Sequence, residues 1–378
     1  MPIIIIICLL LTLGYLLLML AYRRGGARQK EFVLPASYQP STFISVIIPA
    51  RNESGNIGAC LASVLAQQYP RNLFEIIVVD DHSEDGTANA VKGYANVRCI
   101  SLADHLDNGK KINAYKKAAI TAGIAQSKGE LIVTTDADCI VPDEWLLHIA
   151  AIYEKESPVM VVAPVIYSSN HTMIQVFQLI DFMSMQGITA AAHNLKLGNM
   201  SNGANLAFSK KAYKEVSGYT GIDHLASGDD FLLMMKMNKY SPGSIAYLKS
   251  TKAIVSTTPQ PGWGAFLQQR IRWASKSGKY NDTKLTLILV LVYLFNLSFL
   301  VLLFAGIFTP LFFYIAVGMF IIKVLAELFF FVPVARFFGK ERVIRCFFFL
   351  QPLHILYIIV AGFLGVFGSY KWKGRNVR

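Results

Sequence analysis

The stretch ELIVTTDADC, residues 130–139, carries an apolar segment directly into two aspartates, Asp136 and Asp138. The apolar part has the length and the β-branched content of a buried strand. Residues two apart in an extended chain point to the same side, so we expect both carboxylates to meet at the strand end while Ala137 faces away. Two neighbouring carboxylates repel each other, and a divalent cation removes that cost. The pair indicates a Mg2+ or Mn2+ site, although an isolated pair of this kind is more typical of a solvated turn.

Segments around this stretch alternate between strand and helix patterns. Strands are predicted for FISVIIP, FEIIVVDD and VRCISL, and helices for NIGACLASVLAQQ and KKINAYKKAAITAGIAQ. The alternation predicts an α/β domain with a Rossmann-like, mostly parallel sheet. Ligands bind beyond the carboxyl ends of the strands in such sheets. The polar residues that follow the predicted strands are Arg51, Asn52, Glu53, Asp80, Asp81, Asp136 and Asp138.

The N-terminal segment Pro2–Tyr22 has no charged residue and is long enough to cross a bilayer as a helix. A chain with 54% hydrophobic and 16% charged residues is also too apolar for a purely soluble protein. A signal peptide would carry its positive residues before a shorter apolar core, whereas Arg23, Arg24 and Arg28 follow this segment. Positive residues collect on the cytoplasmic side, so we expect a transmembrane anchor and a cytoplasmic domain after it.

Two or three C-terminal transmembrane helices are expected from the apolar stretches Leu285–Phe308, Leu311–Phe331 and Phe347–Phe367. Basic residues mark the loop before the last stretch as cytoplasmic, but they also occur in the tail, at Lys371, Lys373, Arg375 and Arg378. Three full crossings would place that tail outside. We therefore expect the last stretch to form a re-entrant or tilted hairpin at Gln351, Pro352 and His354.

The remaining charged residues and cysteines narrow the class of protein further. Lys323 and Glu327 stand four apart in an apolar stretch and are expected to pair on one helix face. The five cysteines lack metal-type spacing and are expected to be reduced thiols. The net charge of +12 comes without a basic, aromatic-interleaved motif, so we expect no nucleic-acid partner. Membrane flanks and anionic small substrates account for this charge.

Seven motifs occur in a fixed order: SVIIPARNE, VVDDHSEDGT, NGKKINA, TTDADC, SNGANLAF, SGDD and QQRIRW. Over residues 44–276 this ordered set resembles the inverting family 2 glycosyltransferases, which include cellulose and hyaluronan synthases and lipid-directed sugar transferases. The resemblance implies a GT-A fold that binds a nucleotide-diphosphate sugar. Together with the apolar and basic stretches, the expected organisation is an anchor at 1–22, a linker at 23–42, a GT-A domain with interfacial helices at 43–282, a membrane region at 283–370 and a basic tail at 371–378.

The resemblance assigns a role to residues in each motif. The nucleotide pocket would be formed by Pro49, Arg51, Glu53, Asp80, Asp81 and Lys110, with the aspartates on the base and the lysine near a phosphate. Asp136 and Asp138 would hold the cation and the diphosphate, and Asn202 and Gly203 would approach the sugar. For Asp80, Asp81, Glu53 and Asn202 the plainer alternative is an ordinary turn, and for Lys110 it is the start of a helix.

In SGDD the second residue corresponds to the general base, here Asp230, which takes the proton from the acceptor hydroxyl. Relatives often carry Glu where this chain has Asp229, so exchanged roles stay open, as does a plain helix cap for either residue. In QQRIRW the pattern QxxRW falls on Gln269, Arg272 and Trp273, the arginine for the diphosphate and the tryptophan for the acceptor. The alternative is an interfacial helix with Arg270, Arg272 and Lys276 facing lipid headgroups.

The segment Thr172–Asn194 is apolar but interrupted by Gln175, Gln178 and Asp181. It is predicted to be either an amphipathic helix at the membrane surface, guiding a lipid acceptor, or a core helix. The function that the motifs indicate is hexosyl transfer from a nucleotide-diphosphate sugar, expected to be a UDP-sugar, to a lipid acceptor at a bacterial-type plasma membrane. A processive polysaccharide synthase and a non-catalytic membrane subunit are the alternatives. A dinucleotide-dependent oxidoreductase is disfavoured because no GxGxxG follows the first strand.

Overall fold

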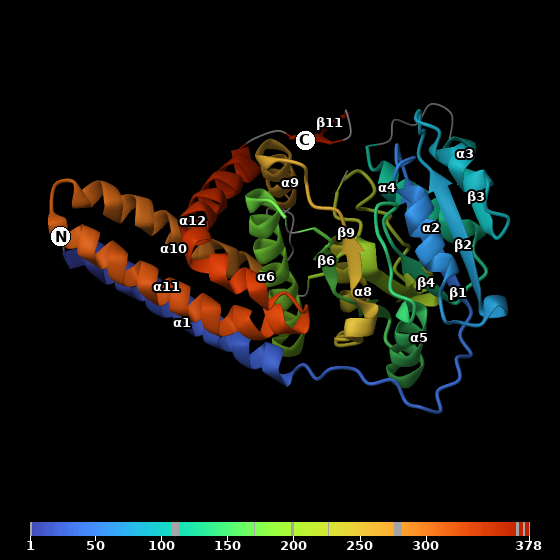
Figure 1. Cartoon of the computed structure of the whole chain (residues 1–378), viewed down its shortest axis with the longest axis horizontal. Coiled ribbons are helices and arrows are strands. Elements are labelled where there is room, and N and C mark those ends of the chain that lie inside the picture. Colours follow the sequence, from blue (N-terminus) through green and yellow to red (C-terminus); the bar gives the residue numbers. More distant parts are fainter. Residues whose placement is uncertain are drawn as a thin grey trace. The chain divides into compact units, whose positions relative to one another are not determined.

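The computed structural model describes residues 2–106, 113–169, 171–197, 200–225, 227–275, 282–367, 370–372 and 375–377. The chain divides into two compact units that interleave in sequence (Figure 1). The helical unit comprises Met1–Gln29, Ser169–Gly198 and Pro259–Arg378, and the α/β unit comprises Lys30–Ser168 and Asn199–Thr258. Each is described by itself.

The α/β unit is built on a seven-stranded sheet in the order β3-β2-β1-β4-β7-β5-β8. Its strands are β1 Ile44–Ala50, β2 Phe74–Asp80, β3 Val97–Ser101, β4 Leu131–Thr134, β5 Met160–Val162, β7 Leu206–Ser209 and β8 Ile245–Tyr247. The first four are mutually parallel, whereas β7 runs antiparallel to both of its neighbours. A second, two-stranded parallel sheet pairs β6 Val165–Tyr167 with β9 Val255–Thr257. The strands predicted at FISVIIP, FEIIVVDD and VRCISL are confirmed.

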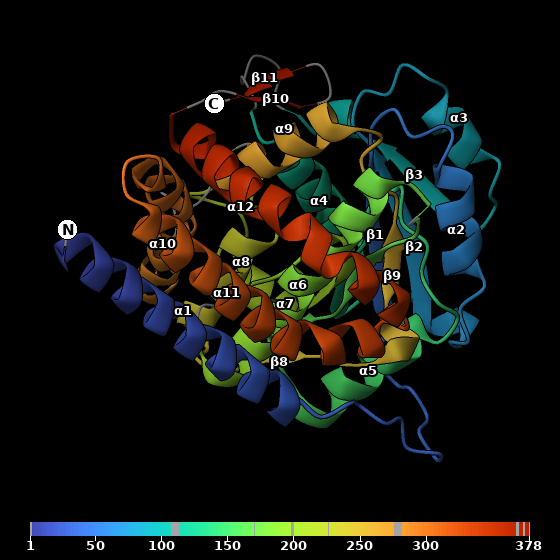
Figure 2. The same cartoon turned by 60° about the vertical axis from the view of Figure 1, so that its left-hand side comes forward.

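Helices connect the strands of this unit. They are α2 Ile57–Leu65, α3 Thr87–Lys92, α4 Tyr115–Gln126 and α5 Trp145–Glu156, followed by α7 Lys210–Glu215 and α8 Phe231–Tyr240. Figure 2 shows α2 and α3 along one side of β1–β3. Helix α4 packs closely on the sheet at Gly123, where a Cβ atom would lie 2.7 Å from Ile47 and 3.2 Å from Val79. The strand order reverses beside β1, so the ends of β1, β2 and β4 form the switch point at which ligands bind.

The end of β4 differs from the extended geometry that the sequence predicts. The strand stops at Thr134, whose register partner on β7 is Leu206, the first residue of that strand. Before Leu206 the neighbouring chain on the β7 side is a 3-10 turn, Gly203–Asn205, so the β4–β7 ladder cannot continue. The chain instead turns, and the Cys139 amide donates to the Asp136 carbonyl at 3.0 Å. The expectation that both aspartates extend a strand is wrong, and they share a turn.

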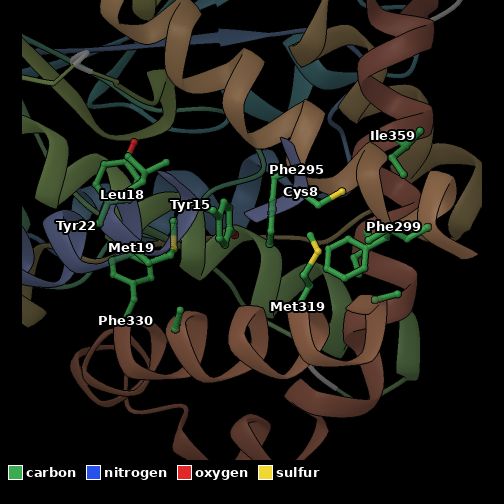
Figure 3. Packing of buried hydrophobic residues seen from close by; sticks show 14 of the residues in the cluster. Cys8, Tyr15, Leu18, Met19, Tyr22, Phe295, Phe299, Met319, Phe330 and Ile359 are labelled. Atoms are coloured by element: carbon green, nitrogen blue, oxygen red, sulfur yellow. The ribbon is translucent and has the colours of Figure 1, made fainter. Parts of the chain in front are cut away.

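The helical unit contains α1 Pro2–Arg28, α6 Met173–Leu195, α9 Trp263–Ala274, α10 Thr283–Gly306, α11 Pro310–Phe337 and α12 Ile344–Phe367, with a terminal hairpin of β10 Tyr370–Trp372 and β11 Arg375–Val377. Among the described residues, four helices are long and apolar enough to cross a membrane: α1, α10, α11 and the helix ending at Phe367. Their shared core is shown in Figure 3, where Tyr15 and Phe295 stack with ring centroids 4.2 Å apart. One N-terminal and three C-terminal helices of spanning length confirm the predicted layout.

Helix α6 corresponds to the segment for which the sequence left a surface helix and a core helix open. It starts with a capping box between Thr172 and Gln175 and packs against α1, α11 and α12. Gln178 and Asp181 are buried rather than displayed, because each has a polar partner within the unit. The core alternative therefore describes α6.

The hairpin expected within the last apolar stretch is wrong. Helix α12 continues through Pro352. The polar atoms of Gln351 are hydrogen-bonded within the helical unit, so this residue does not interrupt the helix. Its amide donates to Glu327 at 2.7 Å, and its carbonyl accepts from Lys323 at 2.6 Å. Lys323 and Glu327 pair at 2.5 Å, as their spacing predicted, and the Tyr15 hydroxyl also donates to Glu327. Fully partnered polar groups are tolerated inside an apolar helix bundle.

Candidate active site

The carboxyl ends of β1 and β2 place Arg51 beside Asp81. Ala50 and Asp80 are register partners, so the residues after them are neighbours as well. The Arg51 Nη1 atom donates to the Asp81 carbonyl at 3.0 Å and lies 3.8 Å from its carboxylate, whose other close contact is His82 Nδ1 at 2.9 Å. One carboxylate oxygen of Asp80, Oδ1, is buried without a hydrogen-bond partner among the described residues. Buried polar atoms are rarely left unsatisfied, so this oxygen is suited to a ligand N–H.

The loops after β1 and β2 are joined by hydrogen bonds. The backbone amide of Asn52 donates to Ser83 Oγ at 3.0 Å, and the backbone amide of Glu53 donates to Thr87 Oγ1 at 2.8 Å. Asn52 adopts a left-handed backbone with φ of 52°, which asparagine tolerates better than most residues. The Glu53 side chain accepts from the Asn56 amide at 2.8 Å. The two loops thus form one wall beyond the sheet. Pro49 lies in β1, near the point where this strand leads into the wall.

The two aspartates after β4 are half-buried and differ in their partners. Asp136 Oδ1 accepts from Lys116 Nζ at 2.6 Å, whereas Asp138 Oδ2 accepts from Thr257 Oγ1 at 3.2 Å. Burial, followed by the negative charges of Asp136 and Glu53, raises the pKa of Asp138 above its ordinary value. A carboxylate held among other carboxylates is a site at which a cation is stabilising.

Lys116, in the first turn of α4, stands at the centre of the acidic residues. Its ammonium lies 2.6 Å from Asp136 and 3.2 Å from Asp229 Oδ2, and it links the turn after β4 to the start of α8. Burial lowers the pKa of Lys116, but the charges of Asp136, Asp229 and Asp230 outweigh burial and raise it above its ordinary value. Sequence reasoning missed this residue. The only signal was a pair of lysines at the start of a helix, which is usually a solvated feature.

Asp230 and Gly203 meet next to this cluster. Asp230 begins α8 as its N-cap, with Oδ1 accepting from the Phe231 amide at 2.7 Å and Oδ2 from the Gly203 amide at 3.2 Å. Gly203 approaches the acidic pair closely, because a Cβ atom there would lie 3.0 Å from Asp229 Oδ2. Asn202 caps the short turn by accepting from the Ala204 amide at 3.0 Å. The capping role foreseen for one of the acidic pair is present at Asp230, and the two amides fix the direction of its carboxylate.

The donors available for a divalent cation are the carboxylates of Asp136 and Asp138. Within the described ranges, no group of three or more His, Cys, Asp or Glu side chains has the geometry to hold a metal ion. Mg2+ and Mn2+ are commonly held by one or two carboxylates together with substrate phosphates, so a two-carboxylate set fits such an ion.

The QxxRW residues lie on α9 in the helical unit. Arg270, within the motif, is buried and ion-paired with Asp181 at 2.6 Å, so the alternative in which it faces lipid headgroups is wrong. The Trp273 ring packs on Phe182 with centroids 6.2 Å apart. Gln269 and Arg272 are partly buried. Lys110 lies outside the residues that the structure describes.

Comparison with known proteins defines the class to which this fold and acidic cluster belong. The family model described as Glycosyl transferase family group 2 matches residues 131–364, well over half of the chain, and the one described as Glycosyl transferase family 2 matches residues 45–216. The α/β unit is that of a GT-A glycosyltransferase. The chain belongs to the family 2 glycosyltransferases, as its motif order indicated.

Individual relatives cover the chain to different extents. A poly-beta-1,6-N-acetyl-D-glucosamine synthase of Staphylococcus epidermidis is 25% identical over 65% of this chain and 57% of its own length. An undecaprenyl-phosphate 4-deoxy-4-formamido-L-arabinose transferase of Aeromonas hydrophila is 38% identical over 27% of this chain and 30% of its own length. The mannosyltransferase PcManGT of Pyrobaculum calidifontis, solved with GDP-Man and Mn2+, has 18% identity and a TM-score of 0.59, covering 96% of this chain and 97% of that one. At this identity the last likeness shows a shared fold.

Proposed function

We propose that this chain is an inverting hexosyltransferase that moves a sugar from a nucleotide-diphosphate donor, a UDP-sugar, to a lipid acceptor at the membrane. The observation that carries the proposal is the Lys116 ammonium, 2.6 Å from Asp136 and 3.2 Å from Asp229. It joins the carboxylates suited to a cation with the acidic pair suited to a base. Both parts of a sugar-transfer site thereby occupy one cluster.

The donor nucleotide is assigned to the wall formed by the loops after β1 and β2. Asp80 and Asp81 would accept from ring N–H groups of the base, and the Oδ1 atom of Asp80, which has no hydrogen-bond partner among the described residues, supports this role. Arg51 holds Asp81 in place through its 3.0 Å hydrogen bond. Pro49 and Glu53 would shape the pocket, and Lys110 would face a phosphate.

Asp136 and Asp138 would hold the divalent cation, with the donor diphosphate supplying further oxygens. When bound, Mg2+ or Mn2+ neutralises the charge that develops on the leaving diphosphate. Arg272 would meet the same diphosphate, since a guanidinium can donate to two of its oxygens. Gln269 and Trp273 would contact the acceptor from the same helix.

Asp230 is the proposed general base. Two backbone amides orient its carboxylate, and the acceptor hydroxyl would lose its proton to it as the hydroxyl oxygen attacks the anomeric carbon. The bond from that carbon to the diphosphate oxygen breaks, and the nucleoside diphosphate leaves with the bonding electrons. Asp229 is engaged by Lys116, and Asn202 and Gly203 would line the sugar.

The acceptor is proposed to be a lipid because the site is carried by a chain with four helices of spanning length. The undecaprenyl-phosphate named for the Aeromonas hydrophila relative supports a lipid phosphate. The basic residues after α1 support a cytoplasmic catalytic unit in a bacterial-type plasma membrane. The Staphylococcus epidermidis relative favours one second candidate, a processive polysaccharide synthase. Chain-length analysis of the product separates the two, because single transfer yields one added sugar.

The test uses the full chain in detergent with UDP-sugars and a panel of lipid phosphates. Mn2+-dependent release of UDP and a glycosylated lipid are expected, with both lost in Asp138→Ala. Asp230→Asn should abolish transfer while calorimetry still detects donor binding, whereas Asp229→Asn should retain part of the turnover. Full turnover in Asp230→Asn, or transfer that persists after chelation of all divalent cations, would refute these assignments.

A further inference from the structure

A buried ion pair connects two helices of the helical unit that are far apart in sequence. Arg270 on α9 donates from Nε at 2.9 Å and from Nη2 at 2.6 Å to the same oxygen, Oδ2, of Asp181 on α6. The two side chains are only 2% and 4% exposed. The second oxygen of Asp181 lies 3.8 Å from Nε2 of His354 on α12. Three helices therefore contribute to the pair.

The Arg270 guanidinium also contacts two other residues of the QxxRW motif, Gln269 and Trp273. Its third nitrogen, Nη1, donates to Gln269 Oε1 at 2.7 Å. Its planar face lies over the Trp273 ring, with 4.2 Å from Cζ to the ring centroid, and over Phe266 at 4.6 Å. A guanidinium that donates in its plane and stacks on its faces fixes several neighbours at once.

Asp181 determines where this guanidinium can lie. A buried arginine without its carboxylate would turn toward water or another acceptor, because an unpaired buried charge is costly. Any such movement breaks the hydrogen bond between Arg270 and Gln269 and removes the guanidinium from the Trp273 ring. The orientation of both motif residues thus depends on a carboxylate outside the motif, on α6.

We propose that Asp181 and Arg270 are positioning residues for sugar transfer, holding Gln269 and Trp273 in the orientation that the reaction needs. This inference rests on the proposed function, in which those two residues contact the acceptor. Neither Asp181 nor Arg270 would touch the substrate. A displacement of about 1 Å in groups that orient a reactant costs about 10²-fold in rate.

Two substitutions separate positioning from simple stabilisation. Arg270→Lys keeps the buried charge beside Asp181 but loses the planar fork and the stacked face, so the helix contact persists while Gln269 and Trp273 are released. Asp181→Asn removes the charge that anchors the guanidinium. The control is Glu327→Gln, which breaks a second buried ion pair among the described residues of this unit, Lys323–Glu327 on α11.

Three measurements are made on the full chain. They are the melting temperature in detergent, kcat with saturating donor and acceptor, and 19F spectra of protein labelled with 5-fluorotryptophan. The chain has four tryptophans, each of which gives a resonance. Trp145 of the α/β unit serves as the internal reference. We expect Arg270→Lys and Asp181→Asn to shift the Trp273 resonance and to lower kcat by about 10²-fold, with donor affinity unchanged.

The control Glu327→Gln should lower the melting temperature but leave the Trp273 resonance and kcat unchanged. A loss of kcat that follows melting temperature across all three variants, or an unmoved Trp273 resonance in Arg270→Lys, would overturn positioning. Failure of the proposed function is recognised separately. In that case the wild-type chain transfers no sugar with any donor, whereas the Trp273 resonance still reports whether Asp181 and Arg270 orient the ring.

Discussion

Replacing Lys116 by methionine tests the arrangement of the acidic cluster. The ammonium makes ion pairs of 2.6 and 3.2 Å, and the side chains of Lys116, Asp136 and Asp229 are 23%, 34% and 14% exposed. At an effective dielectric constant of about 20, each pair is worth about 5–6 kcal/mol before desolvation is subtracted. Removing one partner of a buried pair costs about 3–5 kcal/mol net. Because Asp136 is partly solvated, we expect the lower end, about 3 kcal/mol.

The assay is thermal unfolding with and without Mn2+. For a unit of this size a loss of about 3 kcal/mol corresponds to a fall of roughly 6–12 °C in melting temperature. A cation at Asp136 and Asp138 replaces the lost positive charge, and at 100 times its Kd it contributes about 2.7 kcal/mol. Lys116→Met should therefore gain more from Mn2+ than the wild-type protein, whose ammonium competes with the ion.

The control for this experiment is Lys252→Met. Lys252 pairs with Glu144 at 2.7 Å but is 59% exposed, so its removal should leave both the melting temperature and the Mn2+ response nearly unchanged. The reasoning is refuted when Lys116→Met melts within about 1 °C of the wild-type protein, or when both proteins gain equally from Mn2+.

Three further results are expected. Gly203→Ala would place a Cβ atom 3.0 Å from Asp229 Oδ2, so the acidic pair should shift and turnover should fall by about tenfold or more, measured as UDP release. Burial lowers the pKa of His148 below 6.5, despite the opposing charge of a neighbouring glutamate, so the unfolded chain binds the proton more readily. Stability should therefore be lost as the pH falls below about 6.5, and His148→Gln should flatten this slope in denaturant titrations. Gly187→Ala would bring a methyl group within 2.5 Å of Val334 on α11. The free energy of unfolding should fall by about 1–3 kcal/mol, which a lower melting temperature in detergent would show.

Local patterns were sufficient for much of the fold. The run IIVV at residues 76–79 is apolar and β-branched throughout, and a strand that is buried on both faces requires this composition. Segments without charge over 20 residues have few alternatives to a spanning helix. The pairing of Lys323 with Glu327 also followed from spacing, because residues four apart share a helix face. The order of the motifs along the chain also indicated the family.

The errors have a common physical origin. The strand before Asp136 ends early because its neighbour turns away at Gly203, which is about 70 residues distant in the chain. Helix α12 passes Pro352 because Gln351 finds its partners on α11. In both cases the outcome depends on what lies beside the segment, and a single segment does not contain that information.

The sequence by itself determined the class of fold, the helices of spanning length and the family, because these depend on composition, periodicity and motif order along the chain. Only the tertiary structure decided that Lys116 stands between Asp136 and Asp229, and that Arg270 is turned inward to Asp181. The physical reason is that a charged side chain is buried only where an opposite charge compensates it. Lys116 and Arg270 have these partners on other segments of the chain.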